Sequence, residues 1–222
     1  MGGLAADGVQ IFENVVPPAM VAALIRELPE QVAGARHLLQ QVPAVRALAD
    51  SPPLRALLET LRSPDARPVR AVFFDKNPAH NWKVPWHQDL TIAVRERREV
   101  PGFGPWSVKE GVAHVQPPAA LLARMVTLRV HLDDCAEDNG PLRVRPGSHL
   151  HGRLSDDAIA ALTGSPEITC CVRAGGVVAL RPLLLHASSP ARVPCHRRVI
   201  HLEFSPDLLP DGLEWFEAAA TV

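Results

Sequence analysis

The alternation of apolar and polar residues divides the chain into a helical first part and a strand-rich remainder. Val9–Phe12 predicts a short strand, Pro17-Pro18 opens a helix that runs to about Leu28, and a second helical stretch covers roughly residues 42–61 with a break at Ser51-Pro52-Pro53. Farther along, short apolar runs bounded by turn residues predict strands near 69–74, 82–89, 125–133, 142–145, 168–172, 177–180 and 198–204. This order is typical of an α+β, mainly β chain built around a sandwich or jelly roll.

Residues 95–118 interrupt the strand pattern with a polar segment rich in Pro and Gly, which includes Pro101-Gly102-Phe103-Gly104-Pro105-Trp106. A loop of this length is too long for a simple connection and is typical of a lid or a binding loop, with a solvated insertion as the other interpretation. We therefore expect one domain over residues 1–222, with a mostly helical flank at 1–65, a β core at 66–206 and a lid loop at 95–118.

Composition and charge exclude several classes of protein. The 222 residues are 47% hydrophobic and 21% charged, which is a globular profile, and the net charge of −1 supplies no general attraction to nucleic acid or to an anionic membrane. No apolar run approaches the ~18 residues of a membrane-spanning helix, and the first residues lack the features of a signal peptide. The four Cys form no C-x-x-C pair. We expect a cytoplasmic protein that acts on a small molecule, with neither a nucleic-acid nor a membrane partner.

The histidines carry the candidate chemistry. His87-Gln88-Asp89 places an imidazole and a carboxylate at positions i and i+2, which share one face of a strand. Two His and one carboxylate on one face of an octahedron are typical of non-haem Fe(II) sites, and His186, after the apolar run Leu183–Leu185, is the best third ligand. A second tripeptide, His131-Leu132-Asp133, has an acceptable spacing to His186 as well. From the residues alone both alternatives stay open, with the first favoured.

A longer motif resembles a known family. The segment Asn139–His149, Asn-Gly-Pro-Leu-Arg-Val-Arg-Pro-Gly-Ser-His, is similar to the N-G-x-L-x-V-x-P-G-S-H box of the phytanoyl-CoA dioxygenase family. Lys76-Asn77-Pro78 and the run Trp86–Leu90 resemble the family's K-x-P turn and H-Q-D strand upstream of the box. The segment 128–134 resembles the strand that leads into the box, which implies that His131 faces the pocket without being a ligand. The similarity extends from about Val69 to Phe204, and weakly into the N-terminal helices.

The resemblance implies a fold and a set of site residues. Family members are Fe(II)- and 2-oxoglutarate-dependent oxygenases on a double-stranded β-helix, a cupin-like jelly roll, here with N-terminal flanking helices. His87, Asp89 and His186 would be the catalytic metal ligands, with three positions left for 2-oxoglutarate and O₂. The family's downstream pattern of His, small residue, Ser and a later Arg matches His186, Ser188 and Arg197.

Arg suits the far carboxylate of 2-oxoglutarate because its guanidinium is a bidentate fork. Arg197 would bind that carboxylate with Ser188 as a second donor, whereas Arg198 points to the other face of the strand. Arg129 lies where relatives often carry an aromatic residue. If it faces inward it adds a second positive charge for the cosubstrate or an acidic substrate, and a surface ion pair is the other interpretation.

The expected reaction is hydroxylation of a small-molecule metabolite with release of succinate and CO₂. Related halogenases replace the carboxylate of the motif with Ala or Gly, so Asp89 favours hydroxylation or another oxidation over halogenation. Two alternatives remain: a cupin-type metal enzyme that does not use 2-oxoglutarate, and a non-catalytic module that binds a metal or a small ligand.

Overall fold

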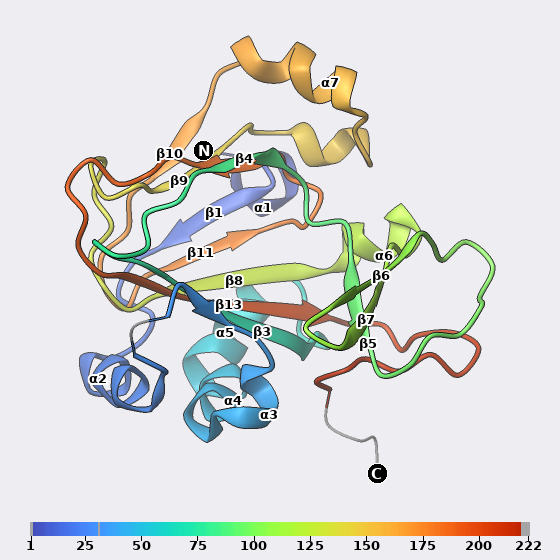
Figure 1. Ribbon diagram of the computed structural model, residues 1–222, viewed down its shortest axis with the longest axis horizontal. Coiled ribbons are helices and arrows are strands. Elements are labelled where there is room, and N and C mark those ends of the chain that lie inside the picture. Colours follow the sequence, from blue (N-terminus) through green and yellow to red (C-terminus); the bar gives the residue numbers. More distant parts are fainter. Residues whose placement is uncertain (1, 31, 219–222) are drawn as a thin grey trace.

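Two antiparallel sheets lie face to face in the computed structural model, which describes residues 2–30 and 32–218 (Figure 1). The major sheet has the strand order β1-β11-β8-β13-β3-β2 and the minor sheet the order β10-β9-β12-β4. The major strands are β1 (Val9–Phe12), β2 (Gly34–Ala35), β3 (Arg67–Lys76), β8 (Val126–His131), β11 (Val177–Leu180) and β13 (Arg197–Ser205). The minor strands are β4 (Val84–His87), β9 (Leu142–Val144), β10 (Ile168–Cys170) and β12 (His186–Ser188). This arrangement confirms the double-stranded β-helix.

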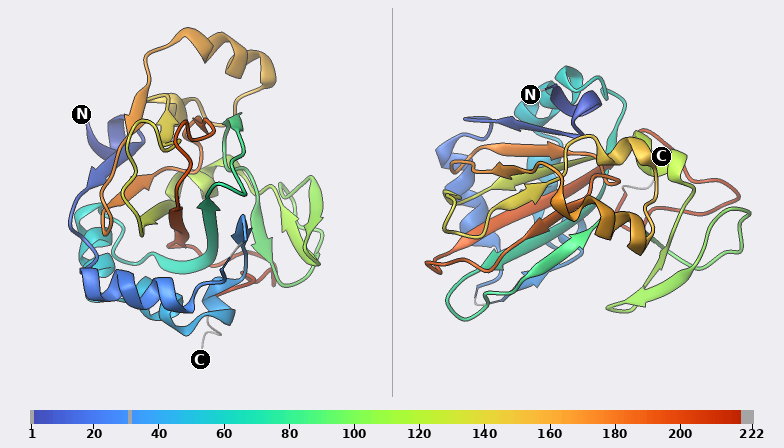
Figure 2. Two further views of the ribbon diagram at one scale, coloured as in Figure 1. Left: turned by 60° about the vertical axis from the view of Figure 1, so that its left-hand side comes forward. Right: turned by 90° about the horizontal axis from the view of Figure 1, so that it is seen from above.

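The N-terminal helices cover the outer face of the major sheet, and the views of Figure 2 show them on the side away from the minor sheet. These helices are α2 (Pro18–Glu27), α3 (Leu38–Gln41), α4 (Pro43–Ala49) and α5 (Pro52–Thr60). Their buried leucines, such as Leu24, Leu48 and Leu58, pack in one cluster with Leu128 and Leu202 of the sheet. No described helix is long and apolar enough to cross a membrane.

Alternation along the central strands gives the major sheet two different buried faces. On β13, Ile200, Leu202 and Phe204 belong to the cluster under the helices, whereas His201 and Glu203 line a cavity on the opposite face. Every residue of β8 is buried, although the strand carries an arginine and a histidine. Because burying a charged side chain without polar partners is costly, a strand that is buried on both sides can carry charged residues only where they face a cavity with such partners.

The predicted elements agree with the structure except at a few places. The expected helices correspond to α2, α4 and α5, and the strand expected at Val9–Phe12 is β1, which pairs with β11 at one edge of the major sheet. Strand β4 ends at His87, so Asp89 lies beyond the strand that was expected to carry it. The remaining short elements are α1 (Gly3–Ala6), α6 (Ala119–Arg124), α7 (Asp156–Ala161) and the 3₁₀ turns Ser148–His151 and Leu162–Gly164.

The segment 95–118, which we expected to be a lid loop, is only partly a loop. The segment contains β6 (Trp106–Lys109) and β7 (Val112–Val115), which form a third sheet with β5 (Ile92–Val94) in the order β5-β7-β6. The inner residues of this sheet belong to a separate apolar cluster with α6 and Trp215 of the C-terminal segment. The Pro and Gly residues between 101 and 105 precede β6 and do not prevent β6 from pairing with β7. The Pro and Gly content of the whole segment therefore gave no sign of these two strands.

Candidate functional site

A cavity of about 400 Å³ opens between the inner faces of the two main sheets. Its lining comes from β3, β8 and β13 of the major sheet, from β4, β9 and β12 of the minor sheet, and from Lys109 of the third sheet. All six residues that the sequence predicts for the site line this one cavity: His87, Asp89, Arg129, His186, Ser188 and Arg197.

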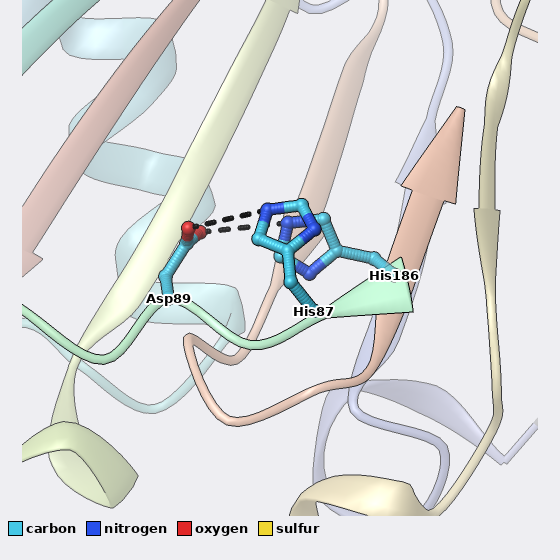
Figure 3. A group of neighbouring side chains, drawn as sticks. All are labelled: His87, Asp89 and His186. Carbon is cyan, nitrogen blue, oxygen red and sulfur yellow. Dashed lines mark ion pairs between the residues drawn. The ribbon is translucent and has the colours of Figure 1, made fainter. Parts of the chain in front are cut away.

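Three of these side chains converge on one point (Figure 3). His87 at the end of β4 and His186 at the start of β12 are partners across the antiparallel pair, and their ring centroids are 4.2 Å apart. The Asp89 carboxylate faces both rings, with Oδ1 3.8 Å from His87 Nε2 and Oδ2 3.7 Å from His186 Nε2. One ligand atom from each residue lies within 4.8 Å of the other two, a spacing that can hold a metal ion.

The hydrogen bonds of the two imidazoles prepare them as metal ligands. His87 Nδ1 lies 2.8 Å from the Pro85 carbonyl and His186 Nδ1 lies 2.8 Å from the Leu184 carbonyl. A carbonyl oxygen can only accept, so each Nδ1 carries a proton, and each Nε2 faces the Asp89 carboxylate. Burial lowers the pKa of His186 to about 4, so its ring is neutral at pH 7, as a metal ligand must be.

Asp89 supplies the charge of the group. Burial alone would raise the pKa of its carboxyl, but the nearby imidazoles of His186, His201 and His87 lower that pKa to about 2. Oδ2 has no hydrogen-bond partner among the described residues, so it is available to a ligand. The side chains of His87 and Asp89 are 38% and 30% exposed, whereas His186 is 4% exposed. An ion held here would be open to the cavity on one side, where further ligands could join it.

The residues around this group hold it in place. Gln88 donates through Nε2 to the Leu183 and Gly152 carbonyls at 2.6 and 2.8 Å. The Asp89 backbone N–H donates to the Pro182 carbonyl at 2.9 Å. Ser148 of the Asn139–His149 box accepts a 2.8 Å hydrogen bond from the N–H of Leu185, the residue before His186. The box therefore positions a candidate ligand rather than supplying one.

The register of the major sheet arranges the inner side chains in rows. Arg197 of β13 lies opposite Lys76 of β3, Val199 opposite Phe74, His201 opposite Val72, and Glu203 next to Arg70. On the other side of β13, His201 lies opposite Arg129 of β8. The cavity thus has a cationic end at Arg197, with Lys76 buried beside it, then an apolar stretch, and a second polar end at Glu203 and Arg70.

Arg197 and Ser188 lie next to Lys76, a residue that the sequence analysis considered only as part of a turn. Lys76 is fully buried, and its Nζ donates to Ser188 Oγ at 2.9 Å and to the Ser189 carbonyl at 2.6 Å. Arg197 donates to the Gly140 carbonyl, and its Nε has no partner among the described residues. Burial, followed by the charges of Arg197 and Arg129, lowers the pKa of Lys76 to about 7. Strand alternation could have identified Lys76 as an inward-facing residue, because it lies on the same face of β3 as Val72 and Phe74.

Arg129 faces inward and takes part in a polar network, so the surface ion pair is not what the structure contains. Its Nη1 lies 3.0 Å from His201 Nδ1, and its guanidinium lies over the Phe74 ring at 5.6 Å. His201 Nε2 lies 3.4 Å from Glu203 Oε1, which pairs with Arg70 Nη1 at 2.8 Å. His201 Nε2 is also 4.0 Å from Asp89 Oδ2. This network, which the sequence reasoning missed, connects the major sheet to the three converging side chains.

The second H-x-D tripeptide is used differently. Asp133 pairs with Arg198, with Oδ1 2.6 Å from Nη2, and also accepts the backbone N–H of Arg198 at 2.8 Å. His131 is buried, and burial holds the pKa of its ring well below the ordinary value. Asp133 therefore does not join a metal-binding group, whereas Arg198 lies on the face of β13 opposite to Arg197, as the strand alternation predicts.

Comparisons with known proteins agree with this arrangement. The family model described as phytanoyl-CoA dioxygenase (PhyH) matches residues 4–199. No curated protein matches the chain at a significant level.

Solved structures share the fold at low sequence identity. AviO1 from Streptomyces viridochromogenes Tue57 is 23% identical with a TM-score of 0.65, over 94% of each chain. HygX from Streptomyces hygroscopicus, with iron bound, is 18% identical with a TM-score of 0.65, over 93% of this chain and 85% of HygX. The epimerase SnoN, in complex with Fe³⁺, alpha ketoglutarate and nogalamycin RO, is 18% identical with a TM-score of 0.69, over 94% of this chain and 88% of SnoN.

Proposed function

The chain belongs to the phytanoyl-CoA dioxygenase family of non-haem Fe(II)- and 2-oxoglutarate-dependent oxygenases, and from that premise we propose that His87, Asp89 and His186 bind the iron and that the enzyme hydroxylates a small organic molecule. The observation that carries the proposal is the convergence of two imidazoles and one carboxylate at the wall of a single cavity. Bound iron would couple the oxidative decarboxylation of 2-oxoglutarate, which yields succinate and CO₂, to oxidation of the substrate by O₂.

The cosubstrate site is supported by buried positive charge. Lys76, Arg129 and Arg197 are buried, and their hydrogen bonds go to hydroxyl and carbonyl oxygens, an imidazole and the Cys135 thiol rather than to a carboxylate. A buried cation without an anion is costly, so this end of the cavity favours a carboxylate ligand. We assign the far carboxylate of 2-oxoglutarate to Arg197 and Ser188, with Lys76 behind the serine.

Arg129 has a different position from Arg197. It lies opposite His201 on β8 of the major sheet, facing the minor sheet that carries His87 and His186, and its Nε has no partner among the described residues. We propose that Arg129 adds positive charge beside the cosubstrate and that its hydrogen bond holds the His201 ring. His201 in turn keeps a polar group 4.0 Å from Asp89 Oδ2, where it can orient the carboxylate.

Hydroxylation is proposed because Asp89 retains the carboxylate that halogenases of this type lack. The alternative reaction is an epimerisation, which inverts one stereocentre of the substrate. The fold similarity to the epimerase SnoN is the only support for it. A product analysis separates the two outcomes, since hydroxylation adds one oxygen atom to the substrate and epimerisation leaves its mass unchanged.

The direct test is succinate formation by protein reconstituted anaerobically with Fe(II) and then exposed to O₂ and 2-oxoglutarate. We expect slow succinate release even without substrate, and its loss when a chelator removes the iron. O₂ consumption without any need for 2-oxoglutarate would instead support the cupin-type enzyme. Iron binding with O₂ consumption no higher than background would support the non-catalytic module.

A further inference from the structure

A second group of cations lines the end of the cavity opposite the proposed cosubstrate site. On the inner face of β3, Arg70 stands six residues before Lys76, which at ~3.3 Å per residue separates the two positions by about 20 Å. Arg36, which follows β2, and Lys109 at the end of β6 line the cavity as well. Burial, followed by the charges of Arg70 and Arg36, lowers the pKa of Lys109, so these three cations act on one another.

The charges of this group are only partly balanced. Arg70 uses Nη1 for its 2.8 Å pair with Glu203, a carboxylate that also lines the cavity. Arg36 Nε pairs with Glu110 at 2.8 Å, but the Glu110 side chain is 61% exposed and does not line the cavity, so water weakens that pair. Lys109 Nζ donates to the neutral Thr91 hydroxyl at 3.1 Å. Apart from Asp89 of the proposed iron site, whose charge also acts on Lys109, three cations thus face one cavity carboxylate, Glu203.

The iron and the cosubstrate would leave this excess in place. Fe(II) brings two positive charges and 2-oxoglutarate two negative ones, so the pair adds no net charge to the cavity. A five-carbon dicarboxylate bound at Arg197 is much shorter than the distance of about 20 Å to Arg70, given the rise per residue of a strand. The cations at the far end are therefore left for another ligand.

We propose that the substrate carries an oxyanion, a carboxylate or a phosphate, which Arg36, Arg70 and Lys109 bind while its carbon skeleton lies over Val72 and Phe74 toward the iron. The inference rests on the proposed function, because it assigns this end of the cavity to the substrate. A neutral substrate would take these cations out of water without giving them a partner, which costs free energy. An oxyanion pairs with them and fixes which carbon of the substrate approaches Asp89.

The test uses matched acid and amide probes on protein that holds Fe(II) and saturating 2-oxoglutarate without O₂, so that the cosubstrate end is already filled. Calorimetry measures the affinity for phenylacetate, phenyl phosphate and the neutral phenylacetamide. We expect at least one acid to bind about tenfold or more tightly than the amide, the factor that corresponds to 1.4 kcal/mol. The stronger of the two acids identifies the oxyanion as a carboxylate or a phosphate.

Two variants and a control assign the effect to the proposed residues. Lys109→Met and Arg36→Met keep most of the side-chain volume, and each should weaken binding of the preferred acid about tenfold while leaving the amide unchanged. Arg173→Met removes an exposed arginine that does not line the cavity and should change neither affinity. Equal behaviour of acid and amide, including failure of both to bind, would overturn the inference.

The same samples separate this inference from the proposed function. If wild-type protein forms succinate from 2-oxoglutarate but does not discriminate between acid and amide, only the oxyanion inference is wrong. If no succinate forms under any condition, the proposed function fails, and the oxyanion inference that rests on it fails too. Arg173→Met should retain the slow substrate-independent succinate formation of the wild type, because Arg173 is exposed and does not line the cavity.

Discussion

At the scale of single residues, two adjacent arginines show how strand phase decides chemistry. Arg197 is 3% exposed and lines the cavity, whereas Arg198 points the other way and pairs with Asp133. Alternation predicts that the two cannot share a face, but it does not say which one enters the cavity. The resemblance to a family pointed to Arg197. The structure gives a physical reason, because Asp133, two residues after β8, binds Arg198.

Arg197→Ala should weaken 2-oxoglutarate binding and leave iron binding intact, because it removes a charge-assisted contact to a buried carboxylate and no proposed iron ligand. A loss of roughly 2–5 kcal/mol is typical of such a contact, and it corresponds to a fall in affinity of about 30-fold or more. Calorimetric titration of 2-oxoglutarate into the Fe(II)-loaded protein measures it. Arg198→Ala is the matched control and should have little effect on this affinity; the opposite order would contradict the assignment.

Lys76 predicts a pH dependence for the same step. Its pKa of about 7 in the free protein means that it carries its charge below pH 7 and loses it above. A carboxylate prefers the protonated amine, so 2-oxoglutarate affinity should fall as the pH rises above about 7, by at most about tenfold per pH unit.

The comparison of wild type with Lys76→Met tests this dependence. The variant should bind 2-oxoglutarate more weakly at pH 6 and show a flatter profile between pH 6 and 8. Lys83→Met changes an exposed lysine that does not line the cavity and should follow the wild-type profile. A profile in Lys76→Met as steep as that of the wild type would show that another group causes the dependence.

At the scale of elements, the third sheet is where composition and structure disagree most. Residues 95–118 are rich in Pro, Gly and charge, and that composition suggested an irregular loop. The sheet is instead attached to the C-terminal segment by backbone hydrogen bonds. The Arg95 N–H donates to the Glu214 carbonyl at 3.0 Å, and the Phe216 N–H donates to the Ala93 carbonyl at 3.1 Å. These partners lie more than 100 residues apart, and local patterning carries no signal for such a contact.

Two valines of the hairpin test whether the segment is a packed element. Val115 on β7 is fully buried and Val108 on β6 is 72% exposed. Val115→Ala should lower the free energy of unfolding by roughly 2 kcal/mol, because it removes two buried methyl groups, whereas Val108→Ala should change it by less than about 0.5 kcal/mol. Urea denaturation of both variants measures the difference. If both changes are neutral, the segment is a loose loop as the composition suggested.

At the scale of the whole molecule, most of the fold could be predicted from the sequence, but not all of the site. The helices and the central strands follow from periodicity, and motif spacing proposes His186 with either H-x-D tripeptide; the resemblance to the family selects His87 and Asp89. Lys76, Arg70, His201 and Glu203 could not be assigned in this way, because their importance comes from the register between β3, β13 and β8, strands that are far apart in the sequence. The partner of each inner residue, rather than its type, decides whether it is structural or functional.

The central proposal is that iron binds at His87, Asp89 and His186 and supports the consumption of 2-oxoglutarate. The most direct measurement compares Asp89→Ala with Asp133→Ala, since both remove the carboxylate of an H-x-D tripeptide and only the first removes a proposed ligand. Fe(II) binding and succinate release are measured on the same samples. Asp89→Ala should lose Fe(II)-dependent succinate release and bind iron weakly, while Asp133→Ala should keep much of both. Succinate release that survives in Asp89→Ala and disappears in Asp133→Ala would contradict the account.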